Sequence, residues 1–240
     1  MSILIVSGTD TGVGKTVVTA AIAALARARG ADVAVVKPAQ TGVGDDEPGD
    51  LDEISRLSGV TDLHEYARFP DPLSPAAAAR ESHRPPVSLA ESASKITELA
   101  RSRRLVLVEG AGGLLVRFDE DGTTVADLAR SLGAPVLVVA RAGLGTLNHT
   151  ALTLEVLALR GVELAGVVIG SWPRHPGLAE RHNVADLEML GARPLAGVLP
   201  EDMARMDAGG FLEGAQSSLG VSLGGRFNQV QFKETFRLEL

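Results

Sequence analysis

Residues 8–16 read Gly-Thr-Asp-Thr-Gly-Val-Gly-Lys-Thr, a run whose residue types could bind phosphate. Glycines let backbone N–H groups close around phosphate oxygens, and a helix that begins at the end of such a loop adds a favourable dipole. Lys15 can reach the outer phosphates, and the Thr16 hydroxyl can ligate magnesium. Gly8 lies six residues before Gly14, one more than in the common P-loop pattern. The alternative is a glycine turn that only caps a helix, which would not require the Gly-Lys-Thr sequence.

Two carboxylates could complete a magnesium site beside this loop. A P-loop threonine supplies one protein ligand, and the other ligands of magnesium are carboxylate, phosphate and water oxygens. Glu109 directly follows the apolar run 105–108 and precedes a Gly-Ala-Gly-Gly sequence, where the backbone can come close to a ligand. Asp50 begins a helical stretch, where an Asp can also serve only as an N-cap. The carboxylates that compete with Asp50 for this role are Asp45, Asp46 and Asp52.

A second lysine, Lys37, ends another apolar run and is followed by Pro38. If both runs are strands of one parallel sheet, Lys37 lies at the same edge of the sheet as Lys15. There it could steady a second anion or a negative charge that develops during a reaction. The alternative for Lys37 taken alone is a lysine that faces solvent at the end of a strand.

A parallel sheet would bring these residues together. Strands are predicted at residues 3–6, 33–36, 105–108, 135–139 and 162–169, which are short β-branched runs bounded by Gly or Pro. Helical spacing of apolar residues marks the stretches 16–29, 50–57, 88–101, 124–132, 146–159 and 178–190. This alternation predicts an α/β fold, a doubly wound and mostly parallel sheet with helices on both faces. Ligands of such sheets bind at the carboxyl ends of the strands.

The length and composition predict one compact domain over residues 1–240. The chain is 45% hydrophobic, which is enough for one large core at this length. Residues 42–49 and 70–75 are predicted to be surface loops rather than domain linkers. The composition changes in residues 214–240, where Gly and Ser give way to a mixture of apolar and charged residues. There Phe232, Phe236 and Leu240 have helical spacing whereas Val230 and Phe232 alternate, so both a helix and an edge strand remain open.

The charge and hydropathy exclude several classes of protein. The chain has 23 Lys and Arg against 30 Asp and Glu, a net charge of −7, and no basic cluster, which argues against a nucleic-acid partner. No apolar run approaches the roughly 18 to 20 residues of a membrane span. The beginning of the sequence lacks the pattern of an export signal, and there is no cysteine. We therefore expect a cytoplasmic protein without a membrane partner.

Five segments together resemble the dethiobiotin synthetase family of P-loop enzymes. They are the P-loop at 8–16, Lys37-Pro38 with Thr41-Gly42, Pro-Leu-Ser-Pro at 72–75, Val-Glu-Gly-Ala-Gly-Gly at 108–113 and Gly-Leu-Gly-Thr-Leu-Asn-His at 143–149. The combination is far more specific than any one member. Gly12 stands where the family often has an acidic residue, and the chain beyond Gly214 carries no resemblance.

The resemblance implies an ATP- and magnesium-dependent ring closure in biotin biosynthesis. One amine of 7,8-diaminononanoate takes up carbon dioxide as a carbamate, ATP phosphorylates the carbamate, and the neighbouring amine closes the ring of dethiobiotin. ADP and phosphate are the other products. Since the second amine sits on the adjacent carbon, closure needs mainly orientation and exclusion of water.

The resemblance also implies which residues form the site. The carbamate and the mixed anhydride would be stabilised by Lys37, Lys15 and Thr11. Magnesium would be held by Thr16, Asp50 and Glu109. Nucleotide contacts would come from Gly12, Val13, Gly14, Lys15, Thr16, Val17, Asp50, Glu109, Gly110, Ala111, Gly112, Gly170, Ser171, Pro200 and Glu201. The substrate would meet Thr41, Pro72 and Ser74, and its carboxylate would meet Gly145, Thr146, Leu147 and Asn148 of the second subunit of a homodimer.

Two other classes of ATPase are alternatives. A regulatory or partitioning ATPase usually carries an additional lysine early in the P-loop, at the position held here by Asp10. A related amide-forming synthetase generally carries a fused glutaminase domain with its cysteine, and this chain has no cysteine. Both features favour the ring-forming synthetase.

Overall fold

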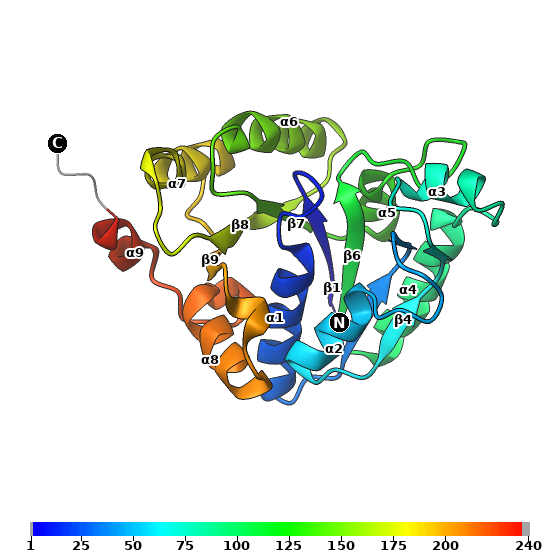
Figure 1. The fold of residues 1–240 in the computed structure, drawn as a ribbon, viewed down its shortest axis with the longest axis horizontal. Coiled ribbons are helices and arrows are strands. Elements are labelled where there is room, and N and C mark those ends of the chain that lie inside the picture. Colours follow the sequence, from blue (N-terminus) through cyan, green and yellow to red (C-terminus); the bar gives the residue numbers. More distant parts are fainter. Residues whose placement is uncertain (1, 237–240) are drawn as a thin grey trace.

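A seven-stranded sheet forms the centre of the computed structural model, which describes residues 2–236 (Figure 1). The strand order is β4-β2-β6-β1-β7-β8-β9, and every neighbouring pair is parallel. The strands are β1 (Ser2–Gly8), β2 (Val33–Lys37), β4 (Leu63–Glu65), β6 (Leu105–Gly113), β7 (Val136–Ala140), β8 (Leu164–Trp172) and β9 (Gly197–Pro200). The predicted parallel α/β sheet is confirmed.

Helices cover both faces of this sheet (Figure 1). One face is covered by α1 (Lys15–Ala28), α2 (Asp50–Ser58) and α8 (Ala208–Ser218). The other is covered by α4 (Leu89–Ser102), α5 (Val125–Leu132), α6 (Thr146–Leu159) and α7 (Leu178–Gly191). Strand β6 supplies both cores by alternation, because Leu107 packs on the α1 side whereas Val106 and Val108 pack on the α4 side.

The predicted helices and strands match these elements, with ends that differ by a few residues. Central strands such as β7, whose five residues are all buried, are recognisable because a parallel strand covered on both faces is apolar throughout. All five predicted strands end later than predicted, and for two of them this changes the place of site residues. Glu109 lies inside β6, and Gly170 and Ser171 lie inside β8, whereas the sequence placed them after strands that end earlier. Pro200 is the last residue of β9, a strand for which no range was predicted.

Several short elements have no counterpart among the predicted ranges. Strand β3 (Gln40–Thr41) pairs in parallel with β5 (Arg68–Phe69) in a separate two-stranded sheet. Helix α3 (Pro75–Glu81) begins at the end of the predicted loop 70–75. Strand β4 and the helix α8 were also missed, because a three-residue strand and a helix that contains Gly-Gly give weak periodic signals.

Short helical elements separated by irregular segments form the chain from residue 214 to residue 236. Helix α8 ends at Ser218, a 3-10 turn occupies Val221–Leu223, and α9 spans Gln229–Thr235. Another 3-10 turn, Met203–Arg205, precedes α8. The ring centroid of Phe232 lies 5.1 Å from the ring centroid of Trp172, the last residue of β8. The open choice between helix and edge strand is thus settled as helix up to residue 235, and Leu240 lies outside the described residues. No helix within residues 2–236 has the length and apolar character needed to cross a membrane.

Candidate functional site

The P-loop joins β1 to α1 at the carboxyl edge of the sheet. Gly12 and Gly14 have φ values of 69° and 97°, in the left-handed region that favours glycine. A side chain at Gly14 would also come within 2.6 Å of the carbonyl oxygen of Gly170 in β8. The loop backbone therefore packs directly on the neighbouring strand, which fixes the position of its N–H groups. Lys15 begins the helix and donates to the carbonyl oxygen of Asp10, 3.0 Å away.

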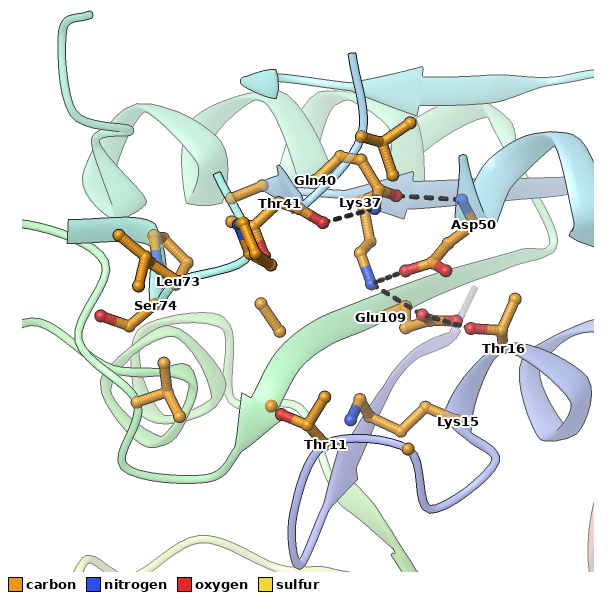
Figure 2. A pocket seen from close by; sticks show the side chains of 18 of the residues that line it. Thr11, Lys15, Thr16, Lys37, Gln40, Thr41, Asp50, Leu73, Ser74 and Glu109 are labelled. Atoms are coloured by element: carbon orange, nitrogen blue, oxygen red, sulfur yellow. Dashed lines mark hydrogen bonds and ion pairs between the residues drawn. The ribbon is translucent and has the colours of Figure 1, made fainter. Parts of the chain in front are cut away.

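Two carboxylates and one ammonium group form a cluster beside this loop (Figure 2). The Nζ of Lys37 lies 2.7 Å from Oε1 of Glu109 and 2.5 Å from Oδ2 of Asp50. The Thr16 hydroxyl donates to the same Oε1 of Glu109, at 3.1 Å. These residues come from β2, α2, β6 and α1, so the four elements must be in place before the cluster exists. The structure brings together all three predicted magnesium ligands.

Burial and charge set the ionisation of the two lysines. Burial lowers the pKa of Lys15 to about 8, and the positive charge of Lys37 acts in the same direction. For Lys37, burial disfavours the ammonium form, but the carboxylates of Glu109 and Asp50 outweigh it and raise the pKa above its ordinary value. Burial works against ionisation of Asp50 as well, and the attraction of Lys37 nevertheless lowers its pKa. Lys37 is therefore a cation at neutral pH and is not suited to act as a base.

A cavity of about 860 Å³ opens in front of this cluster. Its lining includes most of the predicted catalytic, metal and substrate residues, namely Thr11, Gly12, Gly14, Lys15, Thr16, Val17, Lys37, Thr41, Asp50, Pro72, Ser74, Glu109, Ala111 and Gly112. The 72–75 segment lines this cavity, with Leu73 and Ser74 across from the cluster of Lys37, Asp50 and Glu109 (Figure 2). This segment is held against Gly42, whose backbone approaches Pro72 so closely that a side chain at Gly42 would lie 3.2 Å from it.

A second, smaller cavity of about 220 Å³ shares Gly12 with the first. Its lining contains the predicted nucleotide residues Val13, Ser171 and Glu201. It also contains Arg141, which sequence reasoning missed although it directly follows β7 at the carboxyl edge. The guanidinium of Arg141 donates to the Asp10 carboxylate at 3.1 Å and to the Thr11 carbonyl at 3.0 Å, and so ties β7 to the P-loop.

The remaining predicted site residues do not line these cavities. Gly110 packs against Val125, and Gly170 packs against the P-loop backbone. Pro200 is exposed at the end of β9. The predicted carboxylate-binding residues Gly145, Thr146, Leu147 and Asn148 lie at the beginning of α6. Thr146 is buried there, whereas Gly145 and Asn148 are exposed.

Gln40 is a further polar residue in the large cavity that sequence reasoning did not select. It is buried, and its side-chain carbonyl accepts a hydrogen bond from the backbone N–H of Asp50 at 2.9 Å. Its partner is a backbone group ten residues away, so neither the type of residue nor its spacing in the sequence could have predicted this contact.

Comparison with known proteins identifies close relatives over nearly the whole chain. Residues 2–207 match a family described as AAA domain. The ATP-dependent dethiobiotin synthetase BioD of Parafrankia sp. (strain EAN1pec) is 60% identical over 236 residues, which cover 98% of this chain and 99% of that protein. The proteins of the same name from Frankia casuarinae and Streptomyces avermitilis are 61% and 53% identical, each over 236 residues, with the same coverage of 98% and 99%.

Solved structures share the fold at much lower identity. The MinD cell division protein of Aquifex aeolicus has a TM-score of 0.57 and 13% identity, over 93% of this chain and 95% of that chain. MinD of Pyrococcus horikoshii OT3, complexed with Mg-ADP, has a TM-score of 0.51 and 19% identity, over 88% of this chain and 85% of that chain. These similarities establish the P-loop NTPase fold. With the identities above, they show that the chain belongs to the dethiobiotin synthetase family of ATP-dependent ligases in biotin biosynthesis.

Proposed function

We propose that the cluster of Lys37, Asp50 and Glu109 at the P-loop activates a carbamate of 7,8-diaminononanoate for ring closure to dethiobiotin. The observation that carries this proposal is a buried ammonium between two carboxylates, 2.7 and 2.5 Å away, at the mouth of a phosphate-binding loop. A carbamate is an anion that readily loses carbon dioxide, so it needs fixed positive charge around it. Preorganised cations aimed at a developing anion are an efficient means of such stabilisation.

The bond changes of the reaction define what the residues must do. An amine nitrogen of the substrate bonds to carbon dioxide and loses a proton, which gives the carbamate. A carbamate oxygen then bonds to the γ-phosphorus of ATP and ADP leaves. The second amine attacks the carbonyl carbon and loses a proton to solvent, and the carbon–oxygen bond to the phosphate breaks so that phosphate leaves. Lys37 and Lys15 stabilise negative charge in each state, and Thr11 donates a hydrogen bond from the loop.

The oxygen donors at the P-loop suit magnesium. Among the described residues 2–236, no group of three or more His, Asp or Glu side chains could hold a metal ion by itself. Magnesium is commonly held by one or two carboxylates together with phosphate oxygens, and Thr16, Asp50 and Glu109 supply such a set. The Oε2 atom of Glu109 is buried and has no hydrogen-bond partner, so it has a lone pair that could ligate a cation. Bound there, magnesium would neutralise phosphate charge.

The substrate fits the wall of the large cavity that faces the P-loop. We assign its diamine end to the space between Lys37 and Thr41, with Pro72 and Ser74 beside it. Its carboxylate would meet the first turn of α6, Gly145 to Asn148, from the second subunit of a homodimer, because helix N-terminal N–H groups bind carboxylates. The nucleotide base would lie in the smaller cavity beside Ser171 and Glu201. We place the enzyme in the cytoplasm, where its ATP is supplied, and cell fractionation tests this.

A coupled phosphate assay tests the proposed function. Purified protein with Mg-ATP should release phosphate rapidly only when 7,8-diaminononanoate and bicarbonate are both present, and dethiobiotin should form in equal amount. Omission of either compound is the control. Equal phosphate release without the diamine would instead indicate a regulatory ATPase and would contradict the proposal.

A further inference from the structure

The beginning of helix α2 lacks a side-chain cap of its own. The N-cap residue is Gly49, which has no side chain to accept from the first free N–H groups of the helix. The carboxylate of Asp52 accepts from the Gly49 N–H at 2.7 Å. The N–H of Asp50, the first helical residue, is instead satisfied from outside the helix, by Oε1 of Gln40 in β3 at 2.9 Å.

Both ends of the Gln40 amide are held in place. Its Nε2 donates to the carbonyl oxygen of Thr41 at 3.2 Å, and the residue is only 4% exposed. Gly49 packs tightly on it, since a side chain at Gly49 would lie 3.0 Å from Oε1 of Gln40 and 3.0 Å from the Arg68 guanidinium. The amide is therefore a rigid connection between β3 and the first turn of α2 (Figure 2).

Asp50, the residue that Gln40 holds, is one of the three residues that we assign to magnesium. Its side chain is 35% exposed and its carboxylate lies 2.5 Å from Nζ of Lys37, whereas the side chain of Glu109 is fully buried. Glu109 lies within a central strand, whereas Asp50 is the first residue of α2, directly after a loop. The position of the Asp50 carboxylate thus depends on how the helix end is anchored.

We propose that Gln40 is a positioning residue that sets the affinity of the site for magnesium by anchoring the backbone of Asp50. This inference rests on the proposed function, in which Asp50 is a magnesium ligand. Gln40 itself contacts the backbone of Asp50 and not its carboxylate, and it acts on the metal only through Asp50.

The preceding loop is anchored independently of Gln40. The Arg68 guanidinium donates to the carbonyl oxygens of Gly44 and Glu47 at 2.9 and 2.6 Å, and the Glu65 carboxylate fixes it at 2.6 Å. Arg84 pairs with Asp45 in the same loop at 2.7 Å. Loss of the Gln40 hydrogen bond should therefore release the end of α2 without releasing the loop.

The test compares Gln40→Met, which keeps the size but not the acceptor, with the wild-type protein. Two measurements are made: isothermal titration of magnesium into protein saturated with ADP, and hydrogen exchange at the Asp50 amide. One lost hydrogen bond corresponds to about a three- to tenfold weaker Kd for magnesium. The Asp50 amide should exchange faster by a similar factor or more, and the Kd for ADP without metal should not change.

Matched variants separate a positioning role from a general loss of structure. Gln40→Glu keeps an acceptor oxygen for the Asp50 N–H, so the Asp50 amide should exchange more slowly in this variant than in Gln40→Met. Gln216→Met is the control, because Gln216 also accepts a hydrogen bond, from Arg226, but lies on α8 away from the site. If Gln40→Met does not fold, Gly49→Ala gives a second test, since its new methyl group would push against the Gln40 carbonyl.

Asp50→Asn separates this inference from the proposed function. It should weaken magnesium binding, and adding Gln40→Met to it should cause no further loss, since residues that act through one another are not additive. Unchanged magnesium affinity in Asp50→Asn would remove the ligand assignment and this inference with it. Weaker binding in Asp50→Asn, with unchanged affinity and amide exchange in Gln40→Met, would overturn the role of Gln40 alone.

Discussion

Lys37 and Glu109 form a buried ion pair, and both residues also have a role in the proposed reaction. Removing one partner of such a pair leaves an uncompensated charge away from water, which is far more costly than the net contribution of the pair. Here the side chains of Lys37 and Glu109 are 4% and 0% exposed. The ammonium group that we assign to carbamate stabilisation therefore also compensates the charge of the buried Glu109 carboxylate.

Replacing Lys37 with Gln should abolish ring closure while nucleotide binding largely persists. The rate should fall by roughly 10²–10³, as for the loss of one preorganised group that stabilises an anion. The free energy of unfolding should fall by about 3–5 kcal/mol because Glu109 loses its partner. Steady-state rates, nucleotide titration and urea unfolding measure the three effects.

The double variant Lys37→Gln with Glu109→Gln is the control for the change in stability. It removes both charges, so much of the lost stability should return while the activity does not. An unchanged rate in the single variant would remove Lys37 from the mechanism.

Lys15 should make nucleotide binding depend on pH above about 8, where burial has lowered its pKa. Below that pH the ammonium is present and the Kd for ATP should be flat. Above it, binding must take up a proton, so the Kd should rise by up to tenfold per pH unit. The lowered pKa of Lys15 also affects stability, because it reduces the free energy of unfolding below pH 8, where the lysine is charged in both states. Between pH 8 and the ordinary lysine pKa the unfolded chain binds more protons than the folded one. The free energy of unfolding should therefore rise with pH over that range.

Lys15→Arg is the matched variant for this pH dependence, because an arginine stays charged over the whole range. Titration of ATP at several pH values should give a flat profile for this variant above pH 8, whatever its absolute affinity. A wild-type profile that is also flat through pH 9 would contradict the assignment of the pKa to Lys15.

Residues of known sequence motifs were predicted from the sequence, whereas residues that only hold other parts of the site in place were not. Lys15 and Thr16 follow from the spacing of the P-loop motif, and Glu109 follows from the rule that ligands bind at the carboxyl ends of parallel strands. Asp50 was separated from Asp45, Asp46 and Asp52 only by the family resemblance. Gln40 was not predicted because it binds a backbone group, which every residue possesses. Arg141 obeys the strand-end rule and could have been found by it.

At the scale of elements, the P-loop and β8 are fitted to each other through backbone contacts. A side chain at Gly170 would lie 2.1 Å from the carbonyl oxygen of Val13, and one at Gly14 would lie 2.6 Å from that of Gly170. The closest of these contacts are with backbone atoms, which cannot move aside as a flexible side chain can. The position of the phosphate loop therefore depends on a glycine in a strand more than 150 residues away.

Gly170→Ala should therefore weaken nucleotide binding by at least tenfold and lower the melting temperature, because the new methyl group displaces the loop. Titration of ADP and thermal unfolding measure the two effects. Gly209→Ala is the control: Gly209 lies in α8 with open space around it, so alanine should leave binding unchanged and stabilise the helix by up to ~1 kcal/mol. Normal nucleotide affinity in Gly170→Ala would contradict this account of the loop.

Long apolar strands and amphipathic helices were predictable, whereas strand ends were not. Strand β6 continues through Glu109 to Gly113 because β1 pairs with it beyond the apolar run, with Gly8 opposite Gly113. Glycine and glutamate do not signal a strand, so only the pairing reveals the extension. The short pair β3–β5 likewise depends on contacts between distant segments.

At the scale of the whole molecule, α6 presents an apolar surface that one protomer leaves exposed. Leu144, Leu152 and Leu159 are 93%, 56% and 85% exposed on and beside this helix. The first turn of the same helix holds the residues assigned to the substrate carboxylate. Both features support the proposed homodimer, because a second subunit would cover the leucines and use the helix end.

The protein should sediment as a dimer, and Leu152→Glu should shift it towards monomer while the isolated protomer keeps its fold. Since the carboxylate contact would be lost with the partner, the KM for the diamine should rise more than the KM for ATP. Analytical ultracentrifugation and steady-state kinetics measure these changes. A monomeric protein with normal KM would eliminate the contact between subunits.

The fold alone does not separate the ligase from the MinD cell division protein, which shares it at 13% identity. What separates them is whether ATP phosphorylates the carbamate. The most direct measurement uses bicarbonate labelled with ¹⁸O and mass spectrometry of the phosphate released by the wild-type enzyme. If the carbamate oxygen attacks the γ-phosphorus, one labelled oxygen should appear in each phosphate. Phosphate without label, formed at the same rate as dethiobiotin, would contradict carbamate activation at this site.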